Sequence, residues 1–164
     1  MSTTTLTQDQ VTKNHLPAAD ASVGAKFFGT DISGTYLLRE CVEGDDRVFL
    51  RLVTVMADGT WLSSHARQHS REFGFTNQQG VWLTTGPNEI TAKAMDFNYN
   101  PISGDPTAVS RVGFVMRLNP DSLEVRGEMF GERYHLDQNP LNTEEVPVAT
   151  FGNTFSGRRI KIDT

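Results

Sequence analysis

The sequence predicts an all-β protein, an eight-stranded antiparallel up-and-down β-barrel. Eight segments are rich in β-branched and aromatic residues and are bounded by Gly, Pro, Asn or Asp, as strands are. Short turns alternate along the chain with long connections. The turns lie at 57–60, 86–89 and 119–122, and the long connections at roughly 66–79, 99–107 and 135–154. In a meander this alternation gathers the short turns at a closed end and the long loops at an open end.

The predicted strands cover residues 34–42, 46–56, 60–65, 80–86, 89–98, 108–118, 123–134 and 155–162. In the first strand, an inward Tyr36 places Leu38 and Glu40 on the same face. Segment 46–56 is apolar on both faces, and its Val, Thr and Phe content and the turn that follows favour a strand over a helix. We expect a loop or a partner subunit, as in a homodimer, to cover its outer face.

The remaining strands follow from alternation. The inward set of 60–65 ends at His65, 80–86 carries Trp82, and 155–162 carries Gly-Arg-Arg-Ile. Strand 89–98 places Asp96 on one face with Ile90, Ala92 and Ala94. The predicted inward residues of the sixth strand are Ser110, Val112, Phe114, Met116 and Leu118, and those of the seventh are Leu123, Val125, Gly127 and Met129.

Length and composition predict one domain and exclude several functions. The 164 residues form one barrel domain at 23–164, after a polar segment at 1–22 that we expect to be a disordered, mobile tail. The net charge is −5 without a cluster of Lys and Arg, which argues against nucleic-acid binding. No apolar run approaches about 18 residues, so no membrane span is expected. The single cysteine, Cys41, and an N-terminus without a signal-peptide pattern predict a cytoplasmic protein.

Gly34-Thr35-Tyr36 on the first strand and Gly157-Arg158-Arg159-Ile160 on the last resemble the calycin superfamily, which contains the lipocalins. The stretches MADGTWLSS and GVWLTTGPNEI also resemble short bacterial lipocalin-like proteins. The resemblance implies that a first-strand aromatic residue, here Tyr36 in place of tryptophan, packs at the closed end under an arginine of the last strand. We assign that arginine to Arg158, where stacking would contribute about 0.5–2 kcal/mol and would support the fold, not chemistry.

Polar residues at the open end are the candidates for chemistry. Glu40, Asp96 and His65 are the candidate catalytic residues, because a carboxylate in an apolar barrel has a perturbed pKa and histidine transfers protons near neutral pH. The alternative is that Glu40 or Asp96 pairs with Arg51 or caps a loop. The candidate ligand-binding residues are Tyr36, Phe49, Trp61, Trp82, Ser110, Phe114, Met129 and Tyr134, with Tyr36 and Trp82 as the floor.

Other chemistries lack a motif. His65 and His69 are four residues apart, but no third metal ligand is evident and no metal is expected. No Gly-x-Ser-x-Gly elbow and no phosphate-binding glycine loop occurs, so no cofactor is expected.

Three functions stay open from the sequence. The first is a barrel that binds a small apolar or aromatic molecule and acts as a cofactor-free isomerase or cyclase on a natural-product-like substrate. The second is a carrier with the same pocket and no turnover. The third is an interaction module with a filled barrel. A cavity with an inward acid or histidine favours the enzyme, an apolar cavity the carrier, and no cavity the interaction module.

Overall fold

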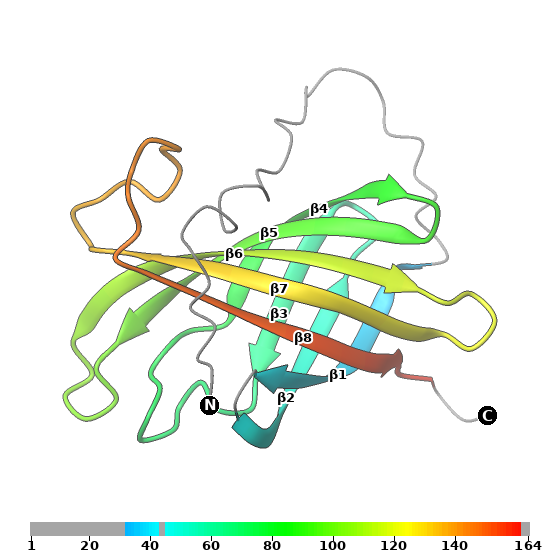
Figure 1. Cartoon of the computed structure of the whole chain (residues 1–164), viewed down its shortest axis with the longest axis horizontal. Helices are drawn as coiled ribbons and strands as arrows, with labels where there is room; N and C mark the ends of the chain where they lie inside the picture. The colour runs from blue at the N-terminus through cyan, green and yellow to red at the C-terminus, as the bar shows by residue number, and fades with distance from the viewer. Residues whose placement is uncertain (1–31, 43–44, 162–164) are drawn as a thin grey trace, which may run out of the picture.

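The computed structural model describes residues 32–42 and 45–161. The expected mobile tail at 1–22 lies outside these residues. The described chain forms one closed barrel of eight antiparallel strands in sequence order, and β1 pairs with β8 to close it (Figure 1). The strands are β1 (Gly34–Val42), β2 (Asp45–Val55), β3 (Thr60–His65), β4 (Gln78–Gly86), β5 (Glu89–Tyr99), β6 (Pro106–Leu118), β7 (Glu124–Tyr134) and β8 (Ala149–Arg159). The predicted all-β barrel is confirmed.

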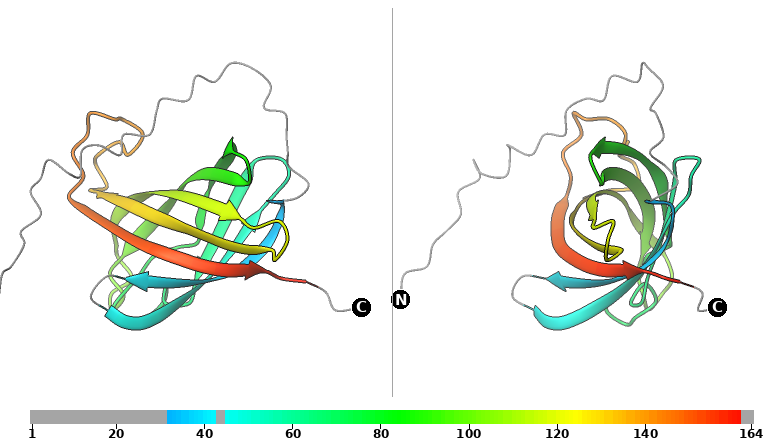
Figure 2. Two further views of the ribbon diagram at one scale, coloured as in Figure 1. Left: turned by 45° about the vertical axis from the view of Figure 1, so that its right-hand side comes forward. Right: turned by 90° about the vertical axis from the view of Figure 1, so that its right-hand side faces the viewer.

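The two ends of the barrel differ as the loop lengths predict. Short turns join β2 to β3, β4 to β5 and β6 to β7, and Gly59, Asn88 and Leu123 take positive φ values of 90°, 59° and 57° there. The longer connections all leave from the other end, which we call the open end (Figure 1). Seen along the barrel, the strands enclose the interior between these ends (Figure 2). Leu123 was expected to be the first inward residue of the seventh strand. It belongs instead to the turn before β7, because its left-handed backbone cannot continue a strand.

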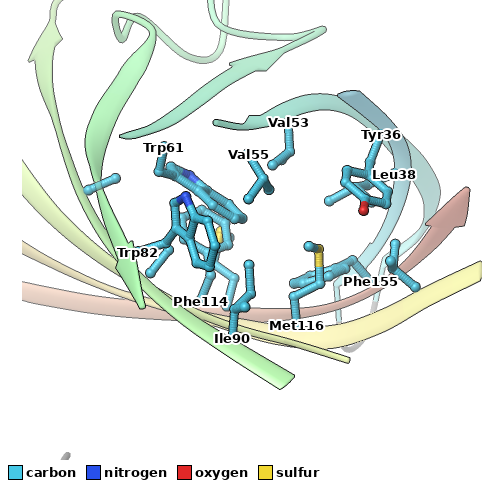
Figure 3. Packing of buried hydrophobic residues seen from close by; sticks show 14 of the residues in the cluster. Tyr36, Leu38, Val53, Val55, Trp61, Trp82, Ile90, Phe114, Met116 and Phe155 are labelled. Carbon is cyan, nitrogen blue, oxygen red and sulfur yellow. The ribbon is translucent and has the colours of Figure 1, made fainter. Parts of the chain in front are cut away.

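The closed half of the barrel is filled with side chains. Tyr36 donates from its hydroxyl to the carbonyl of Ile32 (2.6 Å), and the Trp82 indole donates to the carbonyl of Met56 (2.8 Å). The rings of Trp61 and Phe114 lie 4.8 Å apart between centroids (Figure 3). Every residue of the predicted inward set of β6 is buried, as are Val125 and Met129 of β7. Because this half is core in the described part of the chain, room for a ligand is expected nearer the open end.

The last strand differs most from its prediction. It begins at Ala149 instead of residue 155, and its register places Tyr36 opposite Arg159. Arg158 points to the outer face, where it pairs with Glu124 and is 71% exposed. Our assignment of Arg158 to the closed-end contact is therefore wrong by one residue. A shift of one position exchanges the two faces of a strand, so Arg159 is the arginine on the Tyr36 side.

Glycines of β7 receive aromatic rings from β8. Gly131 lies opposite Phe151 and Gly127 opposite Phe155. A Cβ at Gly131 would lie 2.0 Å from the Phe151 ring, and a Cβ at Gly127 would lie 2.6 Å from the Phe155 ring. Each ring therefore covers the space above a glycine, a cross-strand arrangement that offsets the weakness of glycine in a sheet.

The outer face of β1 and β2 is apolar and exposed. Leu37, Val48, Leu50 and Leu52 are 40–53% exposed there. No loop among the described residues covers this face, and cover by a partner subunit stays a prediction. None of the helical structure in the described ranges is long and apolar enough to cross a bilayer.

Candidate functional site

A cavity of about 300 Å³ occupies the open half of the barrel. Its inner wall is polar and its rim is largely aromatic. The lining residues are Glu40, Phe49, Arg51, His65, Arg67, Phe73, Phe75, Gln78, Asp96, Asn98, Ser110, Met129, Arg133, Ala149, Thr150, Phe151 and Asn153. The volume lies near the lower limit of pockets that bind small molecules, roughly 300–1,000 Å³.

A buried ion pair forms the base of the polar wall. The Arg51 Nε donates to Glu40 Oε1, and these side chains are only 4% and 1% exposed. Arg51 Nη1 also donates to Ser63 Oγ (2.7 Å) and to Gln78 Oε1 (2.5 Å). Because the guanidinium has several donors in a fixed geometry, it holds three neighbouring strands in one arrangement.

Arg51 also fixes the amide orientation of Gln78. A guanidinium only donates, so the Gln78 oxygen must face Arg51 and its nitrogen must face away. That nitrogen donates to Asp96 Oδ2 (2.8 Å). The hydrogen-bond order from Arg51 to Asp96 therefore cannot reverse, and Oδ2 of Asp96 is held as an acceptor.

The other oxygen of Asp96 lies in a chain that can reverse. Asn98 Nδ2 donates to Asp96 Oδ1 (2.5 Å), and Ser110 Oγ donates to Asn98 Oδ1 (3.0 Å). If Oδ1 takes up a proton, a turn of the Asn98 amide lets its oxygen accept from Asp96 while its nitrogen donates to Ser110. The arrangement therefore directs protonation of Asp96 to Oδ1, on the Asn98 side.

The hydrogen bonds of His65 place a ring proton on Nε2. Its Nδ1 accepts from the backbone N–H of Arg67 (3.1 Å), so the ring proton lies on Nε2. Nε2 lies 3.3 Å from Glu40 Oε2, to which it donates. Phe49 and Phe75 flank the ring at centroid distances of 6.0 and 5.6 Å. The ring is thus fixed at the pocket wall with 10% of its side chain exposed.

The two inner carboxylates have opposite pKa shifts. For Glu40, burial raises the pKa, but the hydrogen bond from His65 and the charge and hydrogen bond of Arg51 together lower it to about 2. For Asp96, burial raises the pKa above its ordinary value, and the hydrogen bonds from Gln78, Ser110 and Asn98 only partly offset this. Glu40 is therefore a fixed anion, whereas Asp96 is the carboxyl suited to exchange a proton.

The structure brings six of the eleven predicted site residues to the pocket. Glu40, His65 and Asp96 line it together with Phe49, Ser110 and Met129. Tyr36, Trp61, Trp82 and Phe114 belong to the core beneath and do not line the cavity. The expectation that Tyr36 and Trp82 form the pocket floor is therefore wrong, because Arg51 and its partners separate the core from the cavity.

Tyr134 lies on the outer face of the barrel. Strand alternation places Met129 inside and Tyr134 outside, opposite Val109. Its hydroxyl accepts from Arg111 Nη2 (2.6 Å) and donates to Glu132 (3.1 Å), while Arg111 also reaches the carbonyl of Pro140 in the loop before β8. Tyr134 therefore fastens that loop to the wall, and its expected place inside the open end is wrong.

Several lining residues were missed from the sequence. Arg51 was considered only as a partner of Glu40 or Asp96, although it is in phase with inward Phe49. Asn98 is likewise in phase with Asp96. Gln78 precedes the predicted fourth strand, and Phe151 falls in a predicted loop. The alternation of inward and outward residues could have identified Arg51 and Asn98. No sequence pattern identifies Gln78 or Phe151 as lining residues.

The His65–His69 spacing does not make a metal site in the described part of the chain. His69 stacks on Tyr99 and shares a hydrogen bond with its hydroxyl (2.5 Å), whereas His65 Nε2 faces Glu40. No group of three His, Cys, Asp or Glu side chains among residues 32–42 and 45–161 is arranged to hold a metal ion.

Comparison of the chain with protein-family models, curated proteins and solved structures gave no match. The eight-stranded antiparallel barrel is consistent with a calycin-like fold.

Proposed function

We propose that this protein binds one small, largely apolar, ring-containing molecule in the pocket at the open end. The observation that carries the proposal is the division of the pocket into two parts. Phe49, Phe75 and Phe151 supply flat apolar surface near the rim, and the inner wall carries hydrogen-bonding groups. Such a pocket buries a ring and orients it through one polar group. We also propose that the chain is a lipocalin-like protein and that it is located in the cytoplasm.

Native mass spectrometry of the purified full chain tests binding, because a retained molecule adds a defined mass. Calorimetry with the recovered molecule then compares Phe75→Ala with Phe97→Ala. Phe97 is a matched control, since it is 62% exposed and lies outside the pocket. Loss of the Phe75 ring should weaken binding about tenfold, whereas loss of Phe97 should leave it unchanged. Equal effects of both variants, or no retained molecule and no binding of aromatic probes, would contradict the proposal.

A catalytic form of the proposal is favoured by Asp96. Its Oδ1 lies in a hydrogen-bond chain that can reverse, and its pKa is raised by burial. Cofactor-free isomerisation or cyclisation of a natural-product-like substrate needs such a group to move one proton in a site that excludes water. Asp96→Asn should then abolish turnover while retaining affinity. A carrier would show no turnover in the parent protein.

The cavity weighs against a filled interaction module, but a homodimer stays part of the proposal. The exposed Leu50 and Leu52 side chains on β2 would supply the contact. Sedimentation of the full chain tests this, since Leu52→Glu should convert a dimer to a monomer and a monomeric parent would exclude it.

A further inference from the structure

Two arginines at the pocket rim lie on phenylalanine rings. The Arg67 guanidinium is 4.9 Å from the Phe49 centroid and 5.1 Å from the Phe73 centroid. The Arg133 guanidinium lies 6.0 Å from the Phe151 centroid. Stacking covers one face of a guanidinium and leaves the N–H groups at its edge able to donate in plane.

The two arginines differ in their anionic partners. Arg67 pairs with Glu72. Within residues 32–42 and 45–161, Arg133 has no carboxylate partner. Carboxylates are not scarce, because the chain has 20 Asp and Glu against 15 Lys and Arg. The charge of Arg133 is therefore the one at the rim that an incoming anion can neutralise without displacing a described side chain.

The inner carboxylates do not compete for Arg133. Glu40 is occupied by Arg51 and His65, and Asp96 accepts from Gln78 and Asn98. Both lie on the buried part of the wall. The carboxylates deep in the pocket therefore already accept hydrogen bonds from other side chains. The Arg133 guanidinium at the rim has no such carboxylate partner among the described residues.

Strand register and a glycine place Arg133 over the pocket. Arg133 lies opposite Ser110 on β6 and Ala149 on β8, and all three line the cavity. Two residues earlier on the same face of β7, Gly131 leaves room for the Phe151 ring. The ring therefore forms part of the pocket wall directly beside the guanidinium.

We propose that the ligand is an organic anion, a carboxylate attached to a ring, with its carboxylate paired to Arg133 and its ring against Phe151. The inference rests on the proposed function, since it names the class of molecule that the same pocket takes. A carboxylate accepts two parallel hydrogen bonds from a guanidinium, and the flat ring continues the Phe151 surface. A neutral ring without a carboxylate would contact Phe151 but would leave Arg133 without an anionic partner.

Isothermal calorimetry with 2-naphthoate and 2-naphthamide on the full chain at neutral pH tests the proposal. These probes share a ring and differ in charge. The parent should bind the carboxylate at least about tenfold more tightly than the amide, the difference expected for a charge-assisted bidentate contact. Arg133→Gln should reduce this ratio to within about twofold without weakening amide binding, and Arg133→Lys should restore part of it because it keeps the charge.

Arg126→Gln is the matched control, because Arg126 lies on the same strand but is exposed and outside the pocket. It should retain the full preference for the carboxylate. Equal binding of both probes by the parent would overturn the anion proposal and leave the proposed function intact. A preference that survives in Arg133→Gln would overturn the role of Arg133. Binding of neither probe, with no retained molecule in native mass spectrometry, would contradict the proposed function itself and the anion proposal with it.

Discussion

Arg51 of β2 donates to Glu40 of β1 at the boundary between the filled core and the open pocket. Both side chains are almost fully buried, so each charge depends on the other for stabilisation. The same guanidinium reaches Ser63 and Gln78, and through Gln78 it fixes the acceptor role of Asp96 Oδ2. One ion pair thus supports the barrel and orders the polar wall of the pocket.

Glu40→Gln should destabilise the protein by about 3–5 kcal/mol, because it leaves Arg51 buried without an anion. Urea unfolding at neutral pH measures the change. Glu128→Gln is the control, since Glu128 is exposed on the outer face of β7 and should change stability by less than about 0.5 kcal/mol. A loss below about 1 kcal/mol for Glu40→Gln would show that the pair contributes little.

Glu40 should also impose an acid-dependent loss of stability. Its pKa falls from the ordinary 4.5 to about 2 on folding, so the folded state favours the ionised form. The contribution is fully present above pH 4.5 and is lost as the pH falls from about 4.5 to about 2. The difference in unfolding free energy between the parent and Glu40→Gln should shrink through that window, as followed by urea unfolding at a series of pH values. A constant difference would contradict the assignment.

Asp96 should change the free energy of unfolding with pH in the opposite direction to Glu40. Its pKa is raised above the ordinary 3.8, so the folded state favours the protonated form. Ionisation of this carboxyl in the folded protein costs stability above its folded pKa, and this penalty is relieved as the pH falls through the folded pKa toward 3.8. Carbon-13 NMR of the aspartate carboxyls should show one residue titrating above pH 3.8 that disappears in Asp96→Asn. If no aspartate in the spectrum titrated above its ordinary pKa, the raised pKa of Asp96 would be refuted.

The closed-end contact should depend on Arg159. Arg159 lies opposite Tyr36, whereas Arg158 is exposed and paired only with Glu124. Arg159→Ala should lower stability by about 1–3 kcal/mol, and Arg158→Ala by no more than about 0.5 kcal/mol. Urea unfolding of the two variants decides between the registers. The reverse order of sensitivity would restore the assignment made from the sequence.

The sequence predicted the barrel and its open end because turn chemistry and alternation are local signals. Seven strands agree with their predicted bounds to within two residues, and Glu40, His65 and Asp96 do meet at one pocket. The eighth strand was misplaced because Gly152 and Asn153 resemble a loop, while the pairing with β7 that holds them extended is a long-range property. The Arg158 error follows from the same cause.

The division of the interior into core and cavity was not predictable from local pattern. Alternation shows that Trp61 and Phe114 face inward, but not whether other side chains fill the space beside them. That outcome depends on Arg51, which separates the two halves through partners on β1, β3 and β4. Tyr134 was misplaced although it is five residues from Met129 on β7, so the alternation that turns Met129 inward places Tyr134 on the outer face.

Gly131→Ala should damage both the wall and the pocket. A Cβ at this position would lie 2.0 Å from the Phe151 ring, so the ring must leave its place beside Arg133. We expect a loss of about 1–3 kcal/mol in unfolding free energy from overpacking, together with weaker binding of 2-naphthoate in calorimetry. Gly86→Ala is the control, because its Cβ would make an ordinary 3.6 Å contact with Glu89 at the closed end. If Gly131→Ala bound the probe as the parent does, Phe151 would not form the ligand-facing wall, since its displacement would then leave the binding surface unchanged.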